Sequence, residues 1–236
     1  MVRTILFDLD GTLLPIDTDA FIKGYFRALA AHAGHLIPPE KLVKEVWAAT
    51  GEMIRNTDPA VTNAKVFARA FFPAVGQDEE TLMPVFDSFY RTRFPELRSA
   101  CSGLPGIARS VVQTALEKGY EIVLATNPLF PRVAIEERMR WIEVDDLPWR
   151  LVTVYEDMHA CKPQPAYYQE VLARIGRRPE ECLMVGNDVQ EDGAAALVGI
   201  DVYFVTDFLI NREGRPLPPE RSGSLAAFRD RLLAGL

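Results

Sequence analysis

Short apolar runs recur along the chain, and each is followed by polar or turn-forming residues. Runs of this length that end in turn signals are typical of buried β-strands. The strands expected on this basis cover residues 3–10, 121–125, 151–155, 182–186 and 202–206.

Amphipathic segments of helical length lie between the apolar runs. Apolar residues recur at helical spacing in residues 107–118, 130–141, 165–175 and 190–198. The alternation of strand with helix predicts an α/β fold with a Rossmann-like parallel sheet, helices on both faces and right-handed crossovers. Because ligands of such sheets bind at the carboxyl ends of the strands, we expect the chemistry to lie there.

Residues 17–96 interrupt this alternation, since they contain four helix-like segments and no convincing strand. We therefore expect two domains, an α/β core formed by residues 1–16 and 97–236 and an inserted helical domain formed by residues 17–96. Aromatic residues at helical spacing predict that the insert has its own bundle core rather than a ligand site. These aromatic residues include Phe21, Tyr25, Trp47, Phe67, Phe71, Phe86 and Phe89.

The end of the chain adds one more loop and one more helix. Residues 211–224 are rich in Arg, Pro and Gly and are expected to form a surface loop. Ser224 is a suitable N-cap for a short helix that follows it.

Composition narrows the choice of partners. Lys and Arg total 26 against 33 Asp and Glu, and the net charge of -7 gives no general attraction to nucleic acid. No segment approaches the roughly 18 apolar residues of a membrane span, and the N-terminus lacks the pattern of a signal peptide. The three cysteines are too few and scattered for a disulfide framework. We therefore expect a cytoplasmic protein without nucleic-acid or membrane partners.

The first apolar run ends in two carboxylates. Asp8 and Asp10 are two positions apart, and the period of a strand directs both side chains to one face, about 7 Å apart while the backbone stays extended. In the alternative interpretation the pair only caps the turn at Gly11 and Thr12. Polar residues after other strands favour a shared site instead.

Three such residues follow the second and third strands. Thr126 and Asn127 come directly after residues 121–125, where a hydroxyl and an amide can donate hydrogen bonds to phosphate oxygens. Lys162 stands before Pro163, in a loop rather than on an exposed helix face. Each feature is weak alone, because Thr and Asn are common in turns and a lone lysine is usually solvated.

Two more carboxylates follow the fourth strand. Asp188 and Asp192 are four positions apart and converge on one site if the turn opens a helix, although Asp188 can also serve simply as a helix cap. With Asp8 and Asp10 they would crowd one crevice, where two like charges 4 Å apart repel by about 4 kcal/mol at an effective dielectric of 20. A lysine and a hard dication would offset this repulsion, and oxygen ligands favour magnesium over zinc.

These elements, in this order, resemble the four motifs of the haloacid dehalogenase-like (HAD) hydrolase superfamily. The helical insert is similar to the cap of the phosphoglycolate phosphatase-like and β-phosphoglucomutase-like branch. The resemblance covers the whole core and implies an α/β core with a helical cap. It is carried by Asp8-Leu9-Asp10-Gly11-Thr12-Leu13, Thr126-Asn127, Lys162 and Gly186-Asn187-Asp188-Val189-Gln190-Glu191-Asp192.

The resemblance also implies a role for each catalytic residue. Asp8 is the expected nucleophile, and Asp10 is expected to protonate the leaving alcohol and then to activate water against the aspartyl phosphate. Thr126 and Lys162 are expected to hold the transferring phosphoryl group. Asn127 and Gly11 are the further residues expected to contact phosphate or substrate.

The same resemblance implies a magnesium site formed by Asp8, the backbone carbonyl of Asp10 and a carboxylate of the fourth motif. In the commonest form of that motif, aspartate follows glycine directly, whereas here Asn187 occupies that place. We favour Asp188 as the direct ligand, because an ionised carboxylate binds magnesium better than an amide does. Asp192 is then a partner of a metal-bound water or an alternative ligand.

The expected function is a magnesium-dependent phosphatase that acts on a small phosphorylated metabolite. A sugar-phosphate mutase of the same superfamily is the nearest alternative, since it uses both aspartates but excludes water from the phosphoenzyme. A dehalogenase is disfavoured because that branch usually lacks the second aspartate, present here as Asp10. A non-catalytic binding or regulatory protein on this scaffold is the alternative from another class. Specificity is expected from the cap, where Asp17, Thr18, Asp19 and Lys23 at the start of its first helix are the candidates, although residues at a helix start are often simply solvated.

Overall fold

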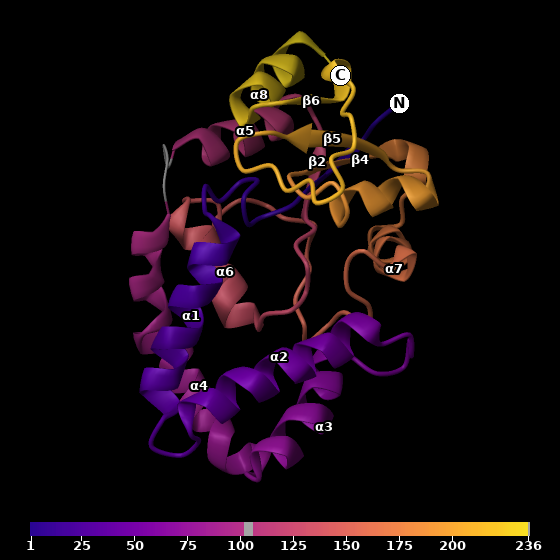
Figure 1. The fold of residues 1–236 in the computed structure, drawn as a ribbon. Helices are drawn as coiled ribbons and strands as arrows, with labels where there is room; N and C mark the ends of the chain where they lie inside the picture. Colours follow the sequence, from indigo (N-terminus) through magenta and orange to yellow (C-terminus); the bar gives the residue numbers. More distant parts are fainter. Residues whose placement is uncertain (102–105, 236) are drawn as a thin grey trace.

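The core of the molecule is a parallel sheet of six strands in the order β3-β2-β1-β4-β5-β6. The computed structural model describes residues 1–101 and 106–235. Residues 102–105 and 236, which belong to the expected core domain, lie outside the described part. The expected fold class, a parallel sheet with helices and an inserted helical segment, is confirmed (Figure 1). The strands are β1 (Thr4–Phe7), β2 (Glu121–Leu124), β3 (Leu151–Val152), β4 (Cys182–Gly186), β5 (Asp201–Val205) and β6 (Ser222–Gly223).

Both faces of the sheet are covered because its strands are apolar on both sides. Within β1, Ile5 and Phe7 belong to the apolar cluster that contains α5 and α8, whereas Leu6 belongs to the cluster that contains α7 and η3. This alternation follows from the period of two of a strand. The helical elements of the core are α5 (Gly106–Glu117), α6 (Arg132–Trp141), α7 (Pro165–Ile175), α8 (Leu225–Ala234) and the 3-10 helices η2 (Pro179–Glu181), η3 (Asp192–Val198) and η4 (Pro219–Arg221).

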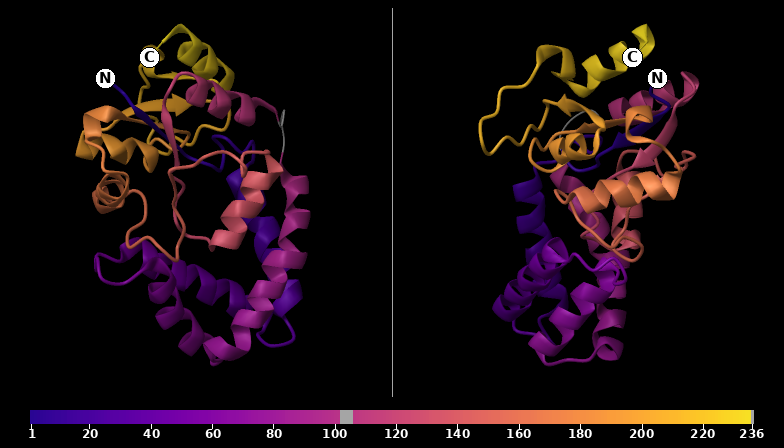
Figure 2. Two further views of the ribbon diagram at one scale, coloured as in Figure 1. Left: turned by 180° about the vertical axis from the view of Figure 1, so that it is seen from behind. Right: turned by 90° about the vertical axis from the view of Figure 1, so that its right-hand side faces the viewer.

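The helical segment between β1 and α5 forms the cap. Helices α2 and α3 pack together at the end of the molecule opposite the sheet, and α1 and α4 connect them to the core (Figures 1 and 2). Side chains of Asp17, Thr62 and Asp78 cap the first turns of α1, α3 and α4. The elements of the cap are α1 (Thr18–Ala33), α2 (Pro39–Arg55), α3 (Asn63–Val75), α4 (Glu79–Thr92) and the 3-10 helix η1 (Phe94–Ala100).

Aromatic side chains form much of the cap interior. Phe21, Phe71 and Phe89 are fully or almost fully buried. The expectation of a bundle core is wrong for Trp47, which is 53% exposed on α2 and has its ring centre 5.3 Å from that of Phe26.

Several element boundaries differ from the sequence-based expectation. The first strand ends at Phe7, because the chain turns at Asp10, which bridges to Leu14, and at Gly11, whose φ is +80°. Strand periodicity therefore does not by itself place Asp10, although Asp8 and Asp10 line one pocket. The third strand is shorter than expected, the segment 190–198 is largely a 3-10 helix, and the expected surface loop contains β6. The helix capped by Ser224 is confirmed.

No helix in the described ranges, 1–101 and 106–235, is long and apolar enough to cross a membrane.

Candidate active site

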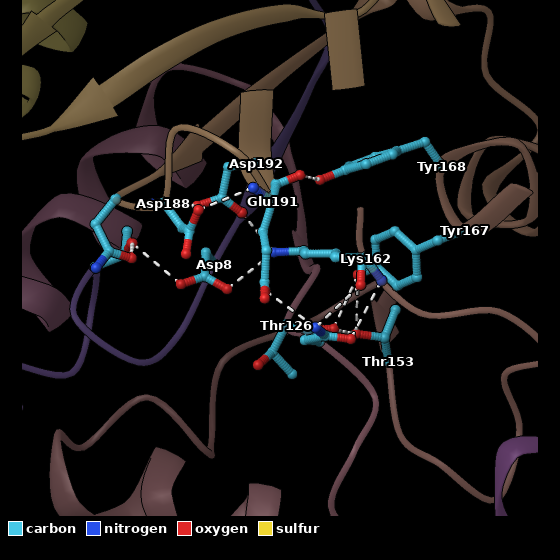
Figure 3. A network of polar contacts seen from close by, with 12 residues as sticks. Asp8, Thr126, Thr153, Lys162, Tyr167, Tyr168, Asp188, Glu191 and Asp192 are labelled. Carbon is cyan, nitrogen blue, oxygen red and sulfur yellow. Dashed lines mark hydrogen bonds and ion pairs between the residues drawn. The ribbon is translucent and has the colours of Figure 1, made fainter. Parts of the chain in front are cut away.

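Asp8 stands at the carboxyl end of β1, between the ends of β2 and β4. Its backbone N–H donates to the carbonyl of Val185 at 2.9 Å, which continues the ladder to β4 by one residue. Its Oδ1 accepts a hydrogen bond from Lys162 Nζ at 2.9 Å, and its Oδ2 accepts one from Thr12 Oγ1 at 3.2 Å (Figure 3). The carboxylate is thus fixed from both sides.

Lys162 joins two of the predicted carboxylates. Its side chain is 1% exposed, and its ammonium group lies 2.9 Å from Asp8 and 2.6 Å from Asp192 (Figure 3). Burial lowers the pKa of Lys162, but Asp192 and Asp8 outweigh it and raise that pKa well above its usual value. Burial raises the pKa of Asp192 to about 7, while Lys162 opposes the rise. The charge of Asp192 therefore depends on the ammonium group beside it.

Thr126 and Asn127 follow β2, as expected. Thr126 is buried and lines the same pocket as Asp8. The Asn127 side chain accepts from the backbone N–H of Lys162 at 3.2 Å and donates to Glu191 Oε2 at 3.0 Å. Asn127 therefore connects the ends of three chain segments, and its amide is engaged by protein groups.

Asp10 lines the same pocket but has a different partner. Its Oδ2 forms an ion pair with Nη1 of Arg138, whose side chain is 0% exposed. Burial raises the pKa of Asp10 above its usual value, Arg138 opposes the rise, and Asp8 adds to it. A carboxyl group with a raised pKa is suited to donating a proton.

The fourth motif brings two carboxylates together through a short turn. Asp192 Oδ2 accepts from the backbone N–H of Asp188 at 2.9 Å, and Asp188 Oδ1 accepts from the backbone N–H of Gln190 and of Glu191, both at 2.9 Å. Arg212 Nη1 lies 2.8 Å from Asp188 Oδ2 and 3.1 Å from Oδ1. One carboxylate thus contacts Lys162, and the other contacts an arginine.

Asn187 takes a structural place in this motif. Its Oδ1 lies 3.0 Å from Thr12 Oγ1, whose single proton it shares with Asp8, and its Nδ2 donates to the carbonyl of Phe208 at 2.7 Å. The same amide lies so close to Gly11 that a Cβ there would stand 2.2 Å from Asn187 Nδ2. Gly11 is the residue that was expected to contact phosphate or substrate. Its position requires glycine, because Asn187 approaches it closely and its φ is positive.

A pocket of about 160 Å³ opens over these groups, between the strand ends and the first cap helix. Thr18, Phe21 and Ile22 line it from α1, so of the specificity candidates Asp17, Thr18, Asp19 and Lys23 only Thr18 lines this pocket. The other lining residues are Asp8, Asp10, Thr126, Asn127, Leu129, Phe130, Asn187, Asp188, Glu191, Asp192, Ile210 and Arg212.

The donor set of this pocket fits a hard cation. Within the described residues no group of three His, Cys, Asp or Glu side chains is arranged to hold a metal by itself. The expected set needs only the carboxylates of Asp8 and Asp188, together with the backbone carbonyl of Asp10, and all three residues line the pocket. Both oxygens of Asp188 already face a cation, the Arg212 guanidinium. Oxygen donors around surplus negative charge favour magnesium or a similar ion.

Arg138 and Arg212 are site residues that the sequence reasoning missed. Arg138 follows Ala134 and Ile135 by four and three positions on the buried face of α6, so a charge on an apolar stripe was an available signal. Arg212 gave no such signal, because it lies in the expected surface loop. It reaches the site because Ile210 pairs with the backbone at Asn187 and Val189.

Comparison with known proteins identifies a family and a fold. Residues 2–199 match the family model described as haloacid dehalogenase-like hydrolase. The chain is 27% identical over 192 residues to the protein named pyrophosphatase PpaX of Anoxybacillus flavithermus, covering 79% of this chain and 75% of that one.

Solved structures share the fold at low identity. An L-2-haloacid dehalogenase from Xanthobacter autotrophicus with chloropropionic acid covalently bound is 15% identical, with a TM-score of 0.61 and full coverage of both chains. A Haemophilus somnus protein described as a predicted phosphoglycolate phosphatase is 18% identical, with a TM-score of 0.58 over 100% of this chain and 98% of that one. By the family match and by its fold, the chain belongs to the haloacid dehalogenase-like hydrolases.

Proposed function

We propose that the chain is a magnesium-dependent phosphatase that transfers the phosphoryl group of a small phosphorylated metabolite to Asp8. The observation that carries the proposal is the setting of Asp8. Its carboxylate stands at the end of a central strand, oriented by Lys162 and Thr12, and Asp10 lines the same pocket. The family match to hydrolases and the relative named pyrophosphatase support phosphoryl chemistry at this position.

In the first step, an Asp8 carboxylate oxygen attacks phosphorus. A bond forms between Asp8 and phosphorus, the bond to the leaving oxygen breaks, and that oxygen takes the proton of the Asp10 carboxyl group. Thr126 lines the pocket in which charge gathers on the phosphoryl oxygens. Lys162, whose ammonium group contacts Asp8, would stabilise that charge and keep Asp8 in its attacking orientation.

In the second step, water hydrolyses the aspartyl phosphate. The Asp10 carboxylate takes one proton from water, the remaining oxygen binds phosphorus, and the bond between phosphorus and Asp8 breaks. The products are inorganic phosphate, the free carboxylate of Asp8 and a protonated Asp10, so the site is ready for another cycle.

Asp8, the backbone carbonyl of Asp10 and Asp188 would hold the magnesium ion. When bound, the ion offsets the negative charge that the substrate phosphate adds to the pocket. Asp192 supports Asp188 by accepting its backbone N–H at 2.9 Å. Asp192 also holds Lys162 in place.

The pocket walls bear on the choice of substrate. Apolar side chains from both domains, among them Ile22, Leu129 and Ile210, line it, and Arg212 adds a cation near Asp188. A cation at this place favours a substrate with negative charge beyond the transferred phosphoryl group. Pyrophosphate, which the name of the PpaX relative indicates, is the first such compound to test.

The decisive experiment is a phosphate-release assay on purified protein. The substrates are p-nitrophenyl phosphate, pyrophosphate and a panel of phosphorylated metabolites, each with magnesium and with a chelator. We expect magnesium-dependent release that disappears in Asp8→Asn. Isomerisation of a sugar phosphate without release of phosphate would identify a mutase, and chloride release from 2-chloropropionate would identify a dehalogenase. Inactivity of folded protein on every substrate would favour a binding role.

A further inference from the structure

Arg138 is fully buried beside aromatic rings, and its Nη2 has no hydrogen-bond partner among the described residues. It heads the largest fully buried side chains among the described residues. Its guanidinium lies 4.5 Å from the ring centre of Phe130 and 5.6 Å from that of Phe21, and its Nε donates to the carbonyl of Ala134 at 3.2 Å. Two aromatic faces, one from the core and one from the cap, thus enclose the charge.

Stability alone is a weak reason for this arrangement. A buried guanidinium needs a charged partner, and Asp10 is the carboxylate with which Arg138 pairs. Replacing a buried ion pair by well-packed apolar side chains often leaves stability unchanged or improves it. The ion pair instead lies beside the pocket that Asp8 and Asp10 both line. Its effect on the orientation of Asp10 is therefore more informative than its effect on stability.

The two oxygens of Asp10 have unlike surroundings. Oδ2 forms the ion pair with Arg138. Oδ1 is buried and has no hydrogen-bond partner among the residues that the structure describes. A buried carboxylate oxygen without a partner is costly, and such atoms in native proteins commonly mark a functional contact. Arg138 therefore occupies one oxygen and leaves the other for a group that enters the pocket.

We propose that Arg138 is a positioning residue that holds Asp10 Oδ2, so that Oδ1 exchanges the proton with the leaving oxygen and then with water. The inference rests on the proposed phosphatase function and deepens it. Because Phe21 belongs to α1, the first helix of the cap, the packing of the cap against the core also supports the orientation of the acid.

A double-mutant cycle between the two residues tests the proposal. Arg138→Met, Asp10→Asn and the double variant are compared with the wild-type protein on an alkyl phosphate and an aryl phosphate. An alkoxide leaves poorly without a proton, so the loss of kcat is expected to be larger for the alkyl phosphate. For that substrate, Arg138→Met should lower kcat by about 10²-fold, within the range of general acid–base catalysis, with KM changed much less. In the Asp10→Asn background, Arg138→Met should lower kcat further by less than about twofold.

Matched controls separate positioning from folding. Arg140→Met removes a half-exposed arginine of the same helix and should leave kcat unchanged. Arg138→Lys keeps the charge but loses the fork of donors, and its kcat should fall between wild type and Arg138→Met. If Arg138→Met does not fold, Arg138→Lys is combined with Asp10→Asn in its place.

The outcomes distinguish the two levels of the proposal. Losses that multiply in the double variant would show that Arg138 acts independently of Asp10, and would overturn its positioning role. A crystal structure of the Arg138 variant in which the Asp10 side chain keeps its orientation would do the same. Wild-type protein that releases phosphate from no substrate would instead overturn the phosphatase function itself.

Discussion

The pocket has two sides, and they are built differently. On the sheet side, Asp8 and Lys162 come from segments that follow parallel strands, and their charged atoms are paired with one another. On the cap side, Asp10 is held by Arg138 of α6, which is covered by Phe21 of the first cap helix. Asp10 also keeps one buried oxygen without a partner among the described residues.

The difference indicates which step each side serves. On the sheet side, Asp8 continues the backbone ladder to β4 and Lys162 holds its carboxylate, as suits groups that must bind a phosphoryl group of constant shape. The cap side depends on packing between two domains, as suits an acid that must meet leaving groups of different shape. Substitutions on the sheet side should therefore affect every substrate, and those on the cap side should depend on the leaving group.

Asp8→Asn should have the largest effect, because it removes the nucleophile of the proposed reaction. We expect kcat to fall by at least about 10³-fold on alkyl and aryl phosphates alike. Folding should persist, since an amide can still accept from Thr12, and thermal unfolding checks this. Asp230→Asn, at a side chain 68% exposed, is the matched control. Substantial activity in the Asp8 variant would refute its role.

Lys162→Met should come next, with losses in both activity and stability. It leaves the buried Asp8 and Asp192 carboxylates without their cation, and breaking a buried pair typically costs about 3–5 kcal/mol. Urea unfolding should show a drop in this range, moderated if Asp192 takes up a proton, whereas Lys44→Met, at a side chain 80% exposed, should change little. Unchanged stability would mean that the two carboxylates tolerate burial without the lysine.

The two sides also differ in how far sequence reasoning could reach them. Asp8, Lys162 and Asp188 were found because a strand pattern is local, and parallel strand ends meet at one edge of the sheet. In the structure Asp8 and Asp188 line one pocket, and Lys162 contacts Asp8. The alternation of strand and helix predicted a parallel sheet with helices on both faces, but it did not predict the order of the strands.

What could not be predicted depends on contacts between distant segments. Arg138 pairs with a residue 128 positions away, and nothing in its helix identifies that partner. Strand β6 has two residues, too few for a periodic pattern, and forms only by pairing with Phe204 and Val205. The division of the chain at residues 16–17 and 96–97, and the catalytic roles, stay predictions.

Asn63→Ala should weaken one of the contacts between the cap and the loops of the sheet side. Asn63 begins α3 and is fully buried, and its Nδ2 lies 3.3 Å from the carbonyls of both Pro128 and Ala160. These carbonyls belong to the loops that carry Asn127 and Lys162, so losing their donor should cost about 1–3 kcal/mol and lower kcat severalfold on all substrates. Asn211→Ala, in an exposed loop, is the control. A loss confined to alkyl phosphates would assign Asn63 to the cap side instead.

The smallest expected effect concerns Arg212, and it is a gain. Its guanidinium lies 2.8 Å from an oxygen of Asp188, the proposed magnesium ligand, so arginine and metal compete for one carboxylate. Arg212→Ala should therefore tighten magnesium binding, measured by calorimetry without substrate, by about fivefold, equivalent to about 1 kcal/mol for a charge pair at high dielectric.

Arg215→Ala is a closely matched control, because both side chains are 56% exposed and lie in one loop, yet Arg215 pairs with Glu213. Asp188→Asn should weaken binding in the same assay. If Arg212→Ala and Arg215→Ala bound magnesium equally, the metal would not use the carboxylate that Arg212 holds, and Asp192 would become the ligand to test.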